Sequence, residues 1–121
     1  MRGNYFIVNP AAGYGRAGRL WDRMREAALR LAPGSSFVVT RSPGEATGLA
    51  RGAALAGVGG IIAVGGDGTF CEALEGVMAV PERERAGVTL GAVPAGSGCD
   101  LARHLGYPRD RDGVLAAVAR A

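Results

Sequence analysis

Short apolar runs alternate with segments of helical periodicity along the chain, and this alternation limits the fold more than any other feature. The apolar runs lie at residues 5–8, 37–40, 61–64 and 88–93. The helical segments lie between and after them, at residues 20–31, 43–56, 69–80 and 100–105 and from residue 112 onward. Strands that alternate with helices form a parallel sheet. The sequence therefore predicts an α/β fold, a three-layer Rossmann-like parallel sheet with helices on both faces.

Turn and cap residues set the expected ends of the helices. Pro33 and Gly34 end the first helix, and Ser42 followed by Pro43 is typical of an N-cap and a first turn. Residues 82–85 alternate glutamate and arginine, which predicts a solvated connection.

The size and composition of the chain indicate one domain over residues 1–121. The chain is 48% hydrophobic, which suits a packed core, and no apolar run approaches the roughly 20 residues that span a bilayer. The N-terminal residues lack the long apolar stretch of a signal peptide. We therefore expect a cytoplasmic protein without a transmembrane segment.

The charged residues and cysteines narrow the kinds of site that the chain could hold. The net charge is +3 and all 14 basic residues are arginines, so a P-loop lysine is excluded. The arginines are scattered, which does not favour nucleic-acid binding. Cys71, Cys99 and His104 lack zinc-ligand spacing, so we expect no metal bound by protein ligands of this kind. Any phosphate site must be built from backbone, arginine, hydroxyls or metal.

Three predicted strands end in unusual loops, at residues 9–13, 65–69 and 94–100. Ligands of open α/β sheets bind at the carboxyl ends of the strands. The loop at 65–69 has three glycines and opens a helix, so its N–H groups can face an anion. Asp67 within it suits a phosphate only if Mg2+ or a hydroxyl proton lies between them. The run at 13–18 matches GxGxxG, but residues 9–12 separate it from the strand, which disfavours a dinucleotide site.

Together, NPxxG at residues 9–13, GGDGT at 65–69 and PxGSxxDLAR at 94–103 resemble the diacylglycerol kinase and sphingosine kinase catalytic domain. The resemblance implies the N-terminal, nucleotide-binding domain of the NAD kinase/diacylglycerol kinase-like fold. It also implies ATP as donor, Mg2+ as counter-ion and a lipid hydroxyl as acceptor. Sphingosine-kinase-like members imply Asp67 as the catalytic base, whereas bacterial diacylglycerol-kinase-like members imply a base in a second, β-rich domain. The positions that it assigns to the nucleotide site are Asn9, Pro10, Ala11, Ala12, Gly13, Thr40, Gly65, Gly66, Asp67, Gly68, Thr69, Glu72, Gly96 and Ser97.

Two departures from the family pattern stand out. Cys71 and Cys99 replace asparagines that are usual in the family, and we interpret both as small buried hydrophobic residues. The chain also stops at Ala121 within a helical pattern, so we expect a fragment that lacks the family's second, β-rich domain. Such a fragment is expected to bind nucleotide weakly or not at all and not to catalyse transfer alone.

Several alternatives stay open at this point. One is a different GGDG enzyme such as an NAD kinase, and another is a nucleotide-binding module without catalysis. The acceptor could be a diacylglycerol, a sphingoid base or an undecaprenyl-like alcohol. Peripheral contact with the inner membrane surface and a homodimer are both compatible with the sequence.

Overall fold

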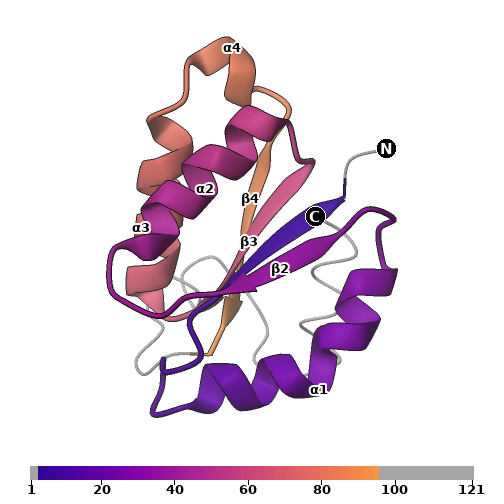
Figure 1. Cartoon of the computed structure of the whole chain (residues 1–121), viewed down its shortest axis with the longest axis vertical. Coiled ribbons are helices and arrows are strands. Elements are labelled where there is room, and N and C mark those ends of the chain that lie inside the picture. The colour runs from indigo at the N-terminus through magenta and orange to yellow at the C-terminus, as the bar shows by residue number, and fades with distance from the viewer. Residues whose placement is uncertain (1–2, 96–121) are drawn as a thin grey trace.

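A parallel four-stranded sheet forms the centre of the molecule (Figure 1). The structure is a computed structural model, and it describes residues 3–95. The strands are β1 (Asn4–Val8), β2 (Ser36–Val39), β3 (Gly60–Gly65) and β4 (Thr89–Pro94), in the order β2-β1-β3-β4. Every neighbouring pair is parallel. The predicted parallel α/β sheet is confirmed.

Helices cover both faces of the sheet, as the sequence predicts. They are α1 (Arg16–Arg30), α2 (Glu45–Ala56), α3 (Asp67–Met78) and the short α4 (Glu82–Arg85). Successive strand residues point to opposite faces. Phe6 and Val8 pack with α1, whereas Ile7 packs with α2 and α3. β3 is buried along its whole length, which explains why its sequence is apolar throughout.

Three helices begin at other residues than the sequence predicts. α3, predicted from residue 69, starts at Asp67. α1 starts at Arg16, because Gly15 at its N-cap has a φ of 89°. The predicted N-cap at Ser42 is wrong: Gly44 occupies that position, with a φ of 87°, and α2 starts at Glu45. The carboxylate of Glu45 instead accepts hydrogen bonds from the backbone N–H groups of Arg41 (2.9 Å) and Ser42 (3.2 Å).

None of the residues in the predicted solvated connection at 82–85 is buried. The segment also forms the one-turn helix α4, because the carbonyl of Pro81 accepts the N–H groups of Glu84 and Arg85 at 2.9 and 3.2 Å. Cys71 is exposed, so its interpretation as a buried residue is wrong. Cys99 and the helices predicted at 100–105 and from 112 lie outside the described residues.

Candidate functional site

The loops after β1, β2 and β3 begin at one edge of the sheet. β1 lies between β2 and β3, so the chain leaves β1 toward one side for β2 and returns past it to β3. The residues that follow the strands continue the backbone ladder: Asn9 N–H donates to Val64 O at 2.9 Å, and Thr40 N–H donates to Val8 O at 2.8 Å. The three loops therefore meet outside the carboxyl ends of the strands, at the point of an open α/β sheet where ligands bind.

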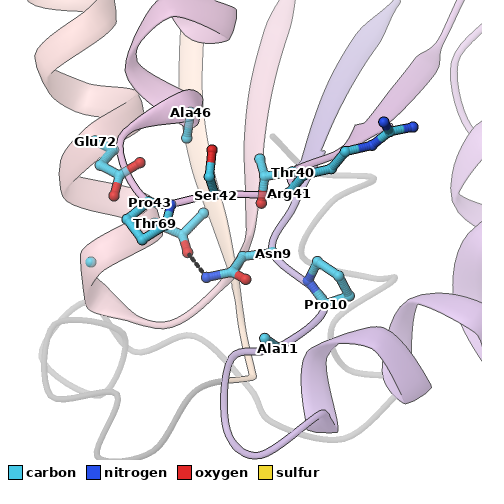
Figure 2. A pocket seen from close by; sticks show the side chains of 11 residues that line it. Asn9, Pro10, Ala11, Thr40, Arg41, Ser42, Pro43, Ala46, Thr69 and Glu72 are labelled. Carbon is cyan, nitrogen blue, oxygen red and sulfur yellow. Dashed lines mark hydrogen bonds between the residues drawn. The ribbon is translucent and has the colours of Figure 1, made fainter.

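A cavity of about 420 Å³ lies between these loops, and its size is within the usual range for small-molecule sites (Figure 2). Residues that follow β1, β2 and β3 all contribute to its lining. Its lining residues are Asn9, Pro10, Ala11, Thr40, Arg41, Ser42, Pro43, Ala46, Gly68, Thr69 and Glu72. The structure thus brings together seven residues predicted for the nucleotide site: Asn9, Pro10, Ala11, Thr40, Gly68, Thr69 and Glu72.

A side-chain hydrogen bond joins two of the predicted loops across this cavity. The amide nitrogen of Asn9 donates to the hydroxyl of Thr69 at 3.2 Å, as the dashed line in Figure 2 shows. Gly65 makes this contact possible, because a Cβ there would lie 2.6 Å from Thr69 Oγ1 and 3.4 Å from Asn9 Cβ. Gly65, which was predicted for the nucleotide site, therefore allows the side chains of Asn9 and Thr69 to approach each other.

The other predicted residues do not line the cavity. These are Ala12, Gly13, Gly65, Gly66 and Asp67, although they belong to the same two loops. Gly13 has a φ of 64°, in the left-handed region that glycine favours, where the chain turns toward α1. Gly96 and Ser97 lie outside the described residues.

The start of α3 offers backbone donors next to the cavity. Gly66 is its N-cap and has no side chain with which to cap the first N–H groups of the helix. Gly68 lies in this first turn, and a Cβ at Gly68 would meet no atom within 4 Å. An anion can therefore approach the positive end of the helix at this position.

Arg41, Ser42, Pro43 and Ala46 are lining residues that the sequence did not predict. Their segment lacks the glycine-rich pattern of the other two loops. The signal that could have found them is their position, since they follow the second predicted strand directly and the carboxyl-end rule applies to every strand. In Figure 2 the guanidinium of Arg41 points away from Asn9 and Thr69.

Glu72 is already engaged in the structure. Its carboxylate accepts a hydrogen bond from the backbone N–H of Gly44 at 3.1 Å. Over residues 3–95, no group of three or more histidine, cysteine or acidic side chains is arranged to hold a metal ion. In the same residues, no helix combines the length and apolarity needed to cross a lipid bilayer.

Comparison with known proteins gives one consistent family. The family model of the diacylglycerol kinase catalytic domain matches residues 4–121. The diacylglycerol kinase of Bacillus subtilis is 42% identical over 91 residues, which cover 71% of this chain and 29% of that protein. A YegS-like lipid kinase of Chromohalobacter salexigens is 41% identical over 88 residues, or 73% of this chain and 26% of that one.

The fold is shared with solved structures as well. A crystal structure of a diacylglycerol kinase from Bacillus anthracis superposes with a TM-score of 0.83 and 26% identity. The likeness covers 98% of this chain and 42% of that one. The chain thus spans less than a third of the two curated relatives and less than half of the solved one.

Proposed function

The chain belongs to the diacylglycerol kinase catalytic domain family, and from this premise we propose that it is the ATP-binding part of a lipid kinase. The cavity at the carboxyl ends of β1, β2 and β3 is the proposed nucleotide site. The reaction is transfer of the γ-phosphoryl group of ATP to a lipid hydroxyl. The observation that supports this most strongly is the convergence of seven residues, predicted from the family pattern, on one cavity of suitable size.

The phosphates are proposed to lie at the start of α3. The N–H groups of its first turn are donors, and Gly68 leaves the space beside them open. The hydroxyl of Thr69 accepts a hydrogen bond from the side-chain amide of Asn9, so its own O–H can still donate a hydrogen bond to a phosphate oxygen. In this proposal Asn9, Pro10, Ala11 and Thr40 line the nucleoside side.

The residues present also fit Mg2+ that arrives with the nucleotide. Mg2+ is usually held by one or two carboxylates together with substrate phosphates, and does not need a cage of protein ligands. Asp67 is the first residue of α3 and is only half-buried, so its carboxylate is proposed to face the metal side of the phosphates. When bound, Mg2+ would neutralise charge on the phosphates.

Asp67 is also the proposed base for the acceptor hydroxyl. The lipid itself is proposed to be a diacylglycerol or a similar alcohol, presented at a membrane surface. Such transfer needs both substrates aligned, so we expect the 121-residue chain to bind nucleotide weakly and not to transfer phosphate alone.

The test is a bulky substitution that blocks the cavity without disturbing the core. Gly68→Leu places a side chain into open space at the site. Gly48→Leu is the matched control, because Gly48 also lies in a helix and a Cβ there would also meet no atom within 4 Å, but it lies outside the site. Calorimetric titration with Mg-ATP should give heat with the wild type and with Gly48→Leu, and none with Gly68→Leu.

Two results would contradict the proposal. One is equal affinity of Gly68→Leu and the wild type for Mg-ATP, which would show that the nucleotide binds outside this cavity. The other is tighter binding of Mg-NADPH than of Mg-ATP, which would favour an NAD kinase-like activity. Circular dichroism of each variant verifies that it is folded.

A further inference from the structure

A single hydrogen bond connects α3 to the turn that precedes α2. Glu72 Oε1 accepts the N–H of Gly44 at 3.1 Å, and these residues are 28 positions apart in the sequence. Glu72 lines the cavity from the α3 side, while Arg41, Ser42 and Pro43 of the turn line it from the β2 side. The bond therefore joins two walls of the same cavity.

The carboxylate of Glu45 also accepts hydrogen bonds from the turn, but Glu45 follows the turn directly in the sequence, whereas Glu72 belongs to α3. Glu45 Oε2 accepts the N–H groups of Arg41 and Ser42 at 2.9 and 3.2 Å. Glu45 is the first residue of α2 and moves with the turn, so it can fix only the internal shape of the turn. Glu72 belongs to another helix and can fix where the turn lies relative to α3.

Farther along the helices, α2 and α3 are held at a short distance by glycine. A Cβ at Gly76 would lie only 2.1 Å from the carbonyl oxygen of Thr47 and 3.0 Å from Ala50 Cβ. Residues four apart lie on the same face of a helix, so Glu72 and Gly76 both face α2. The backbone contact at Gly76 holds the two helices close together, and Glu72 lies one turn nearer the cavity on the same face of α3.

The carboxylate of Glu72 accepts from the backbone N–H of Gly44, for which the neighbouring residues supply no side-chain acceptor. Gly44 occupies the N-cap of α2. In a capping box a Glu or Gln side chain at the third helical position accepts the N–H of the N-cap residue, but that position of α2 is Thr47, and the acceptor comes from α3 instead. An amide oxygen can accept this hydrogen bond as well as a carboxylate oxygen can.

We propose that Glu72 is a positioning residue, which holds the turn of residues 41–44 against α3 and so sets the width of the cavity. It acts as a hydrogen-bond acceptor for Gly44 and not as a ligand of metal or phosphate. This inference rests on the proposed nucleotide site for its functional meaning, but the contact itself can be tested without nucleotide.

The first arm of the test measures amide hydrogen exchange in the ligand-free chain. Glu72→Ala should speed exchange of the Gly44 amide by roughly tenfold, because the only side-chain acceptor described for it is lost. Glu72→Gln should stay within about threefold of the wild type, since its amide oxygen replaces the acceptor. Glu75→Ala, an exposed change of the same charge on α3, is the control and should have no effect at Gly44. Unchanged protection of Gly44 in Glu72→Ala would overturn the proposal.

The second arm measures the affinity of the same variants for Mg-ATP by chemical-shift titration. Glu72→Ala should weaken binding by roughly three- to tenfold, and Glu72→Gln should restore it to within about twofold of the wild type. If Glu72→Gln loses as much as Glu72→Ala, the negative charge is what matters and Glu72 is a ligand, which overturns the proposal. If the wild type binds no Mg-ATP, the proposed function fails, while the exchange arm still decides whether the contact positions the turn.

Discussion

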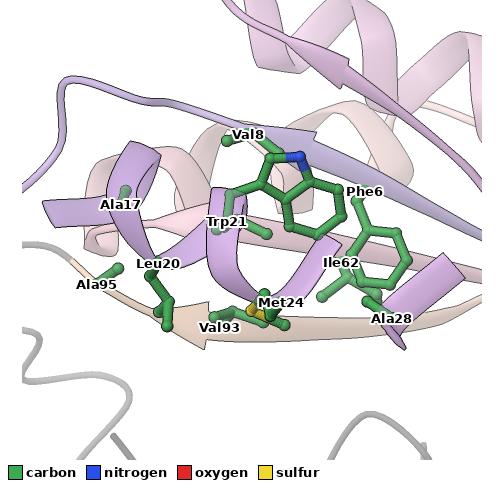
Figure 3. Close-up of a cluster of buried hydrophobic side chains, with 11 residues drawn as sticks. Phe6, Val8, Ala17, Leu20, Trp21, Met24, Ala28, Ile62, Val93 and Ala95 are labelled. Atoms are coloured by element: carbon green, nitrogen blue, oxygen red, sulfur yellow. The ribbon is translucent and has the colours of Figure 1, made fainter. Parts of the chain in front are cut away.

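On the face of the sheet that α1 covers, the helix contributes large side chains to the core, whereas the buried helix residues on the face under α2 and α3 are mostly alanine. Figure 3 shows Trp21 of α1 packed beside Phe6 of β1, with ring centroids 4.9 Å apart, and Met24 nearby. On the opposite face the buried helix residues include Ala46, Ala50, Ala53, Ala54 and Ala73. The two faces therefore use different means to hold their helices.

This difference bears on the site. Large side chains supply most of the free energy of burial, so the α1 face is expected to dominate global stability. Small residues bring helix backbones close together, so the opposite face is expected to determine where the helix ends lie. Ala46, Gly68 and Glu72, which line the cavity, all come from α2 and α3. The closely packed face thus sets the geometry of the site.

The largest expected effect is on the α1 face. Trp21→Ala should lower the free energy of unfolding by about 3–5 kcal/mol, because Trp21 is 2% exposed and contacts both Phe6 and Phe37. Chemical denaturation measures the loss. Asp22→Ala, an exposed neighbour on the same helix, is the control and should cost little. A loss below about 1 kcal/mol for Trp21→Ala would contradict the comparison of the two faces.

A smaller loss of stability with a larger effect on the site is expected from Gly76→Ala. The new Cβ would clash with the carbonyl of Thr47, so α2 and α3 must separate, at a cost of about 1–3 kcal/mol. Binding of Mg-ATP should weaken, because the turn before α2 moves with its helix. Gly52→Ala is the matched control: its Cβ meets nothing within 4 Å, and it should raise stability by up to about 1 kcal/mol. Equal changes in the free energy of unfolding for Gly76→Ala and Gly52→Ala would show that the helices are not closely packed at Gly76.

The bond between Asn9 and Thr69 is expected to contribute less. Thr69→Val keeps the shape of this buried side chain but removes the acceptor, which should cost about 1 kcal/mol and weaken Mg-ATP binding. Thr69→Ser keeps the hydroxyl and should retain the binding. Denaturation and nucleotide titration of both variants test this. Loss of binding in Thr69→Ser equal to that in Thr69→Val would indicate that the methyl group matters, and not the hydroxyl.

The smallest expected effect concerns Tyr5, which packs against the α2 and α3 side of the sheet. Burial raises the pKa of Tyr5 above its ordinary value. The unfolded chain therefore loses this proton first, and the stability that the neutral phenol provides below about pH 10 falls as the pH rises above that value. Tyr5→Phe should show a shallower decrease between about pH 9 and 11. Identical slopes for variant and wild type would contradict this assignment.

The sequence was sufficient for the architecture, because the alternation of apolar runs and helical segments leaves few arrangements. It was also sufficient for two of the cavity walls, since residues 9–11 and 68–69 belong to recognisable loops. Of the third wall, the family resemblance assigned only Thr40; residues 41–43 carry no such pattern and could not be predicted. It could not give the partner of Glu72 either, because a contact to a backbone N–H 28 residues away depends on helix packing and not on local sequence.

The start of α2 is a second feature that the sequence alone did not predict. Ser42 has the right residue type for an N-cap, but Gly44 adopts the left-handed conformation and takes that position. The side chain of Glu45 then folds back over the turn. Residue preferences alone favour serine, and the backbone conformation decides otherwise.

ATP is proposed to bind in the cavity between the three loops, and chemical-shift mapping is the sharpest test of that placement. Mg-ATP is titrated into the isotope-labelled chain while the backbone amide signals are followed. We predict that the largest amide shifts fall at residues 9, 11, 40–42, 44 and 66–72. The placement would be contradicted if the shifts gathered at the separate groove lined by Gly48 and Gly52, or if a folded chain showed none at saturating nucleotide.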